Sequence, residues 1–202
     1  MHLRPFHIFK FTKHSHIVKI LTLNDVLYWS GDTFISVVLA LFVTQYINGA
    51  SASSVGVAYM IYKLSSSITT TSAGKFFDKH KGFADEIWAL FLVSFVAGLT
   101  YIALSFGTEL WHLYLAMGVL GVAESFDINS WKLLFYTHLE KNKQGRVIGT
   151  YDAIYGVSAA AMAALAGFIG EAYGFRVVIF VAGLIVFASG LPILSLKKDK
   201  SV

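Results

Sequence analysis

A small set of ionisable side chains stands inside long apolar stretches of the sequence. Glu124 and Asp127 are three residues apart and so share one face of a helix, which Trp131 continues. Asp32 and Lys63 stand in two earlier stretches. In a low-dielectric interior, pairing with a carboxylate is the cheapest way to keep a lysine ammonium charged. These residue types could therefore bind a charged or polar solute, or carry a proton.

This cluster admits two interpretations. In the structural one, the charges form buried ion pairs whose only role is to fix the helix register. In the functional one, which we favour because ionisable groups inside a membrane are typical of transport pathways, they form a substrate or proton pathway. That pathway would be made by Asp32, Lys63, Glu124, Asp127 and Trp131. Three weaker candidates stand near the ends of their stretches, where they could reach water or pair locally: Asp25, Lys132 and Asp152.

The composition indicates the environment of these stretches. The chain has 202 residues, of which 56% are hydrophobic and only 14% charged, with a mean hydropathy of +0.64. A soluble domain carries about 25% charged residues. The aromatic content of 15% excludes a disordered chain. The absence of cysteine from the sequence excludes a disulfide scaffold, a thiolate metal site and a cysteine nucleophile. We therefore expect an integral membrane protein.

The apolar residues fall into six stretches of membrane-spanning length. A bilayer core about 30 Å thick requires about 20 predominantly apolar helical residues. Short polar or glycine-rich breaks separate the stretches, so the sequence predicts an all-α membrane protein with one bundle of six transmembrane helices over residues 21–196. The predicted spans are 25–47, 55–77, 87–106, 110–134, 147–169 and 177–196.

Positive charge lies mostly on one side of this predicted bundle. Most of the 16 Lys and Arg residues stand in residues 1–20, in the second and fourth breaks, and in residues 197–202. The positive-inside rule makes residues 1–20 a cytoplasmic basic N-terminal segment and residues 197–202 a cytoplasmic basic tail. We expect a multi-pass protein of the plasma (inner) membrane that contacts membrane lipid and no nucleic acid. The histidines of the N-terminal segment have no accompanying carboxylate, so no metal site is predicted.

The break after the second stretch carries a motif. It reads GKFFDKHKG over residues 74–82. This resembles the cytoplasmic signature Gly-x-Leu-Ala-Asp-Arg-x-Gly between helices two and three of the major facilitator superfamily. Gly74, Asp78 and the basic Lys79 match in place, whereas Phe76 stands where leucine is usual.

Two further runs are similar to segments of the same family. The run QGRVIG over residues 144–149 contains Arg146, and the run YGFRVVIF over residues 173–180 is similar to the family's entry into helix six. The resemblance implies one half of a twelve-helix transporter, with helices one and four lining a cavity and helices three and six outside. It also implies a cytoplasmic hinge or latch made by Gly74, Asp78, Lys79 and Arg146.

The chain departs from this family at two positions. Met117 stands where the proton-linked motif of helix four has arginine, and the fifth stretch contains no Gly-Pro pair. Neither proton antiport nor drug efflux is therefore indicated.

We expect transmembrane transport of a small solute by alternating access, as a homodimer of six-helix halves. A split transporter with a different partner, a truncated gene, and a non-transporting receptor or assembly protein stay open. The paired acids suit a cation, a zwitterion or a proton-coupled solute, and the aromatic residues suit a sugar equally well. An enzyme is not expected, because the stretches contain no nucleophile–base pair or metal constellation, and no cofactor is predicted.

Overall fold

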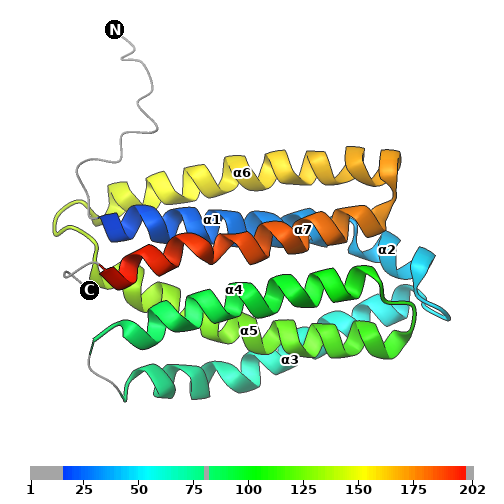
Figure 1. Ribbon diagram of the computed structural model, residues 1–202, viewed down its shortest axis with the longest axis horizontal. Helices are drawn as coiled ribbons and strands as arrows, with labels where there is room; N and C mark the ends of the chain where they lie inside the picture. Colours follow the sequence, from blue (N-terminus) through cyan, green and yellow to red (C-terminus); the bar gives the residue numbers. More distant parts are fainter. Residues whose placement is uncertain (1–15, 80–81, 199–202) are drawn as a thin grey trace, which may run out of the picture.

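The computed structural model describes residues 16–79 and 82–198, which are entirely helical or in short links. The long helices lie side by side along one axis, and the two ends of the described chain lie at the same end of the molecule (Figure 1). Most of the predicted N-terminal segment, and the tail after Lys198, fall outside the described residues. The elements are α1 His16–Ser36, α2 Leu39–Tyr46, α3 Ala52–Phe77, α4 Ala84–Ser105, α5 Leu110–Thr137, α6 Gln144–Tyr173, α7 Phe175–Ser189 and the 3-10 helix η1 Leu191–Lys198.

The first predicted span differs from the observed one in two ways. Helix α1 begins at His16 rather than at Asp25, because the apolar residues that precede Asp25 are buried in the bundle. The span is also bent by 49° between α1 and α2. The hydroxyls of Thr33 and Ser36 bond to backbone carbonyls one turn earlier, which bends helices, and Val37 and Val38 follow directly.

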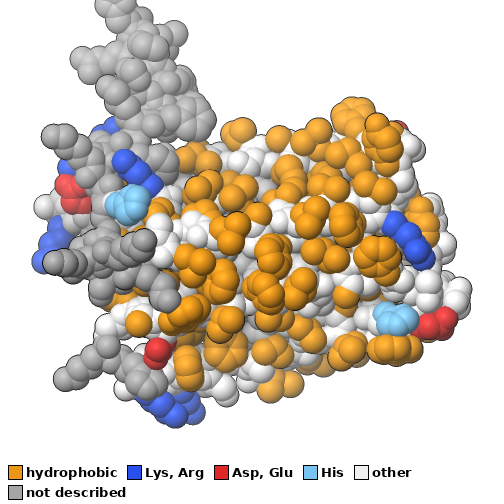
Figure 2. Space-filling view, viewed as in Figure 1, with side chains coloured by type: hydrophobic (Ala, Val, Ile, Leu, Met, Phe, Trp, Pro, Cys, Tyr) orange, Lys and Arg blue, Asp and Glu red, His pale blue; other side chains and the backbone are white. Residues whose placement is uncertain are grey.

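The apolar character of the helices is uneven. By length and composition, three helical segments of the described chain could cross a membrane, namely α4, α6 and Phe175–Leu196, and the bent α1–α2 pair makes a fourth. Helix α3 fails this criterion although it is 26 residues long, because it carries Lys63 and many serines and threonines. Helix α5 has 28 residues but contains Glu124, Asp127 and Lys132. The face in Figure 2 shows a broad apolar belt between two ends that carry the charged side chains.

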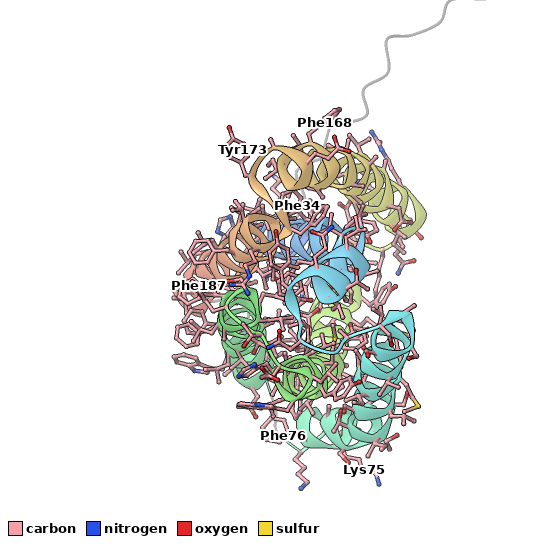
Figure 3. The ribbon with its side chains drawn as sticks, turned by 90° about the vertical axis from the view of Figure 1, so that its right-hand side faces the viewer. Phe34, Lys75, Phe76, Phe168, Tyr173 and Phe187 are labelled. Carbon is pink, nitrogen blue, oxygen red and sulfur yellow. The ribbon has the colours of Figure 1, made fainter. Side chains whose placement is uncertain are left out.

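The end-on view shows how polar and apolar helices are separated (Figure 3). Helices α4 and α7 lie together on one side, and α3 and α6 lie at opposite ends of the molecule. Helices α1 and α5 lie between them. The main contacts join α3 to α5, α4 to α7 and α5, and α1 to α6 and α7. The side of the bundle away from α4 and α7 thus carries the charged residues that stand away from helix ends, since those of α4 and α7 lie in the first turn.

Glycines allow the closest helix contacts. A Cβ atom on Gly121 of α5 would lie 2.2 Å from the carbonyl oxygen of Tyr62 on α3. A Cβ atom on Gly98 of α4 would lie 2.6 Å from the backbone nitrogen of Phe187 on α7. Small residues permit such backbone approach in lipid, where no water drives helices together. Both helix pairs are therefore held at a separation that only glycine allows.

Helix α6 is the least covered element. Its buried residues are Val147, Ala166 and Gly170, whereas Phe168 and Tyr173 are 71% and 73% exposed and point away from the bundle (Figure 3). It is joined to α7 through one residue, Gly174, whose φ of +86° favours glycine. Helix α6 thus offers a long apolar surface that the described chain leaves uncovered.

Candidate functional site

The predicted pairing of Lys63 with a carboxylate is present between α3 and α5. The Lys63 Nζ atom lies 2.9 Å from the Glu124 Oε1 atom. The Glu124 side chain is 6% exposed, whereas that of Lys63 is 47% exposed. The same ammonium lies 4.7 Å from the ring centroid of Tyr62 and 5.9 Å from that of Tyr59. One cation thus contacts a carboxylate and two aromatic rings at once.

Asp32 of α1 lies next to this pair. Its Oδ1 atom accepts a hydrogen bond of 2.7 Å from the hydroxyl of Tyr101 on α4. It is close enough to Lys63 and Glu124 to interact electrostatically with both. The phenol orients the carboxylate but supplies no positive charge. Asp32 therefore retains the capacity to bind a cation or a proton.

Asp127 is the most deeply buried of the predicted site residues. It is 2% exposed, and no hydrogen bond reaches its Oδ2 atom from the residues that the structure describes. It interacts electrostatically with Asp25 and Glu124. A buried carboxylate without full hydrogen bonding is costly, so such groups are concentrated at functional sites.

Trp131 belongs to a different part of the molecule from the one predicted. Its indole Nε1 donates to the Leu21 carbonyl at 3.2 Å, and its ring stacks on Phe135 with centroids 4.4 Å apart. Its ring centroid also lies 5.0 Å from that of Tyr151, whose hydroxyl donates to Asp25. Trp131 is thus packed in an aromatic cluster that joins α1, α5 and α6. Asp25 is 3% exposed and pairs with another helix, so the prediction that it reaches water or pairs locally was wrong.

A cavity of about 320 Å³ opens beside Asp32. It lies between the α1–α2 bend, α3, α4 and α5, and three tyrosines line it: Tyr59, Tyr62 and Tyr101. A larger cavity of about 700 Å³ lies on α3, α4 and α5, but its wall is nearly all apolar, for example at Trp88 and Leu92. The smaller cavity is therefore the one whose wall combines a carboxylate of the predicted site with tyrosines. No group of three or more His, Asp or Glu residues suited to a metal occurs in the described part of the chain.

Comparison with known families now identifies the architecture. The sequence matches the Major Facilitator Superfamily over residues 21–201. The chain belongs to this superfamily. Among curated proteins, none matches it. Since members of the superfamily are transporters of small solutes, the polar side of the bundle is the side on which a transport site is to be sought.

The superfamily motif residues lie at the end of α3 and at the start of α6. The Asp78 amide donates to the Gly74 carbonyl at 3.1 Å and so closes the last turn of α3. Lys79 follows as an exposed residue, and Arg146 is exposed in the first turn of α6. Within residues 16–79 and 82–198, no side-chain hydrogen bond or ion pair connects these four positions. Their role as a hinge or latch stays a prediction.

Two tyrosines of this superfamily member were missed by the sequence interpretation. Tyr101 belongs to a span predicted to lie outside the cavity, yet it bonds Asp32. Tyr151 bonds Asp25 across 126 residues of sequence. The only signal was a hydroxyl-bearing ring within a predicted span, and tyrosine is also common at membrane interfaces. Tyr101 is the eighteenth of the 22 residues of α4, so its position along the span gave no stronger signal.

Proposed function

We propose that this chain is one six-helix half of a transporter that moves a small solute by alternating access. The observation that carries the proposal is the convergence of Asp32, Lys63 and Glu124, from three helices, next to a cavity whose wall includes Asp32. Charged groups inside a membrane are expensive and are retained where a pathway needs them. The site residues are Asp32, Lys63, Glu124 and Asp127, and their removal abolishes transport.

Six crossings follow if α3 and α5 also span the bilayer. At 1.5 Å per residue they are about 39 and 42 Å long, more than the hydrocarbon core of about 30 Å. Glu124 is paired with Lys63, and Asp127 is buried. The exposed Lys75 and Lys132 stand toward the ends of their helices, where a long side chain can reach water, so these charges do not exclude the two helices as spans. An even number of crossings and the basic segments support a plasma (inner) membrane orientation with both termini in the cytoplasm.

A second half completes the pathway, and a second copy of this chain is the simplest source. The polar side is bounded by α3 at one end and α6 at the other (Figure 3). A two-fold axis along the membrane normal therefore sets α3 of one copy against α6 of the other. The exposed small residues of α6 would allow close approach there, since a Cβ atom on Gly156 would meet nothing within 4 Å.

Cysteine cross-linking tests this arrangement directly, because the sequence has no cysteine of its own. Two differently tagged chains, one with Ser67→Cys on α3 and the other with Gly156→Cys on α6, are expressed together and oxidised in membranes. We expect a heterodimer of the two tags. The matched control replaces Gly156→Cys by Leu184→Cys, which is 47% exposed on α7, on the opposite side, and should give no such product.

The outcomes separate the alternatives. Strictly monomeric behaviour in membranes contradicts the homodimer, and a cross-link to a chain of different mass indicates a split transporter. Reconstituted vesicles then test transport itself. If solute flux is unaffected by Glu124→Gln together with Asp127→Asn, the pathway role of these residues is wrong and a receptor or assembly role is favoured.

A further inference from the structure

The cavity beside Asp32 has an unusual balance of charge. Asp32 is the one charged residue in its wall, which otherwise consists of the three tyrosines, Ser36 and apolar side chains such as Ile35 and Leu39. The nearest ammonium, Lys63, is already 2.9 Å from Glu124. Asp127, buried close to Glu124, adds another carboxylate. Around the cavity, three acids are therefore opposed by one base among the described residues.

This balance discriminates between ligand classes. An anion would face Asp32 with no unpaired cation to receive it. A zwitterion would need an ammonium for its carboxylate, and Lys63 is neutralised by Glu124. A cation meets neither obstacle, because the hydrogen bond that the Asp32 carboxylate accepts from the described residues comes from a neutral phenol. Complementary charge at a desolvated site favours the ligand of opposite sign.

The aromatic residues favour the same class. The rings of Tyr62 and Tyr59 already hold the Lys63 ammonium at 4.7 and 5.9 Å, distances typical of cation–π contacts. Both tyrosines also line the cavity. The wall that faces the ligand is thus built from groups that bind ammonium ions and apolar carbon.

We propose, resting on the transport function above, that this cavity binds a hydrophobic organic monocation. Its positively charged nitrogen contacts the Asp32 carboxylate and the Tyr59 and Tyr62 rings. Its apolar part packs against Ile35, Leu39 and their neighbours in the remaining wall. A volume of about 320 Å³ fits a compact amine and excludes large multi-ring cations.

Equilibrium binding to the purified full chain tests this, in nanodiscs of uncharged phosphatidylcholine. The probes share one ring and differ in charge: phenethylamine, the permanently charged benzyltrimethylammonium, neutral 2-phenylethanol and anionic phenylacetate. We expect both cations to bind at least about tenfold more tightly than the other two. Asp32→Asn should weaken cation binding about tenfold or more, and Glu171→Gln, which removes an exposed carboxylate outside the cavity, should leave it unchanged.

A second variant keeps the test decisive if Asp32→Asn does not fold. Tyr59 is 61% exposed, so Tyr59→Leu should fold and should weaken cation binding about fivefold while sparing 2-phenylethanol. The proposal is overturned if 2-phenylethanol or phenylacetate binds as tightly as the cations. It is equally overturned if neither variant alters cation binding. Binding is independent of dimerisation and flux, so a chain that binds cations without transporting them contradicts only the proposed function.

Discussion

The α3–α5 and α4–α7 pairs both use glycine to bring two helices close together, but the contacts around the glycines differ. Beside Gly121, α3 and α5 are joined by the Lys63–Glu124 ion pair and by a 2.8 Å hydrogen bond from Thr69 to Ser125. Beside Gly98, α4 and α7 are joined mainly by apolar contacts, including the rings of Phe95 and Phe187 at 4.9 Å.

This difference explains why a criterion of length and apolar composition does not count α3 and α5 as membrane-spanning helices. The α4–α7 pair has the hydropathy of membrane spans, whereas α3 and α5 do not. In α3 and α5 some of the polar groups bond to each other across the interface, as Lys63 does to Glu124 and Thr69 to Ser125. A polar helix can thus be stable in a membrane when its partner supplies the opposite charge. Both helices of the polar pair border the Asp32 cavity, to which the apolar pair contributes only Tyr101 among the described residues.

The largest expected loss of stability is steric, and it should be similar for the α3–α5 and α4–α7 pairs. Gly121→Ala places a methyl 2.2 Å from a backbone oxygen, and Gly98→Ala places one 2.6 Å from a backbone nitrogen. Since backbone must move in both cases, we expect each to lower the free energy of unfolding by about 3 kcal/mol. Unfolding in mixed detergent micelles measures this.

The control for that prediction is Gly167→Ala on α6, where the added methyl meets nothing within 4 Å. It should be neutral or stabilising because alanine is the better helix former. A tolerated Gly121→Ala would mean that α3 and α5 are not packed as closely as described.

The next largest effect should come from removing the ion pair, which joins α3 to α5 and has no counterpart between the described residues of α4 and α7. Lys63→Met leaves the buried Glu124 carboxylate without its cation and should cost about 2 kcal/mol, whereas Glu124→Gln frees a half-exposed lysine that can turn to water and should cost about 1 kcal/mol. Unfolding of both single variants and of the double variant measures the coupling between the two residues. Equal losses from the two single variants would contradict the burial difference.

A smaller effect is expected from the polar contacts of the apolar side. Ser94 of α4 accepts from the Ser189 hydroxyl at 3.2 Å and from the Asn24 amide at 3.5 Å. Ser94→Ala should lower the melting temperature slightly, equivalent to about 1 kcal/mol, because only neutral hydrogen bonds are lost. A loss as large as that of Lys63→Met would show that this network matters as much as the ion pair.

The smallest effect is expected at an ion pair outside the membrane region. Glu140 and Lys143 are paired at the start of α6, with side chains 44% and 45% exposed. Glu140→Gln should change the free energy of unfolding by less than about 0.5 kcal/mol, because water screens exposed pairs. Raised salt should reduce the stability effect of Glu140→Gln and leave that of Glu124→Gln unchanged, because salt screens only the exposed pair.

Much of this architecture could be predicted from local sequence. Continuous apolar runs gave the bounds of α3 to α6 within a few residues, and counting residues along the spans brought Lys63 to the depth of Glu124. The bend after α1 could not be predicted, because it depends on which hydroxyls turn back onto the backbone. The partners of Asp32 and Asp25 could not be predicted either, because tyrosine fits both an apolar and a polar surrounding.

The one-residue link between α6 and α7 has a mechanical consequence. Gly174 fastens one end of α6, and the rest of that helix, about 45 Å long, is held mainly by α1. A tilt of α6 by about 10° about Gly174 would therefore carry its far end about 8 Å. The bond from Tyr151 to Asp25 lies near that far end, where even a small rotation would pull it apart.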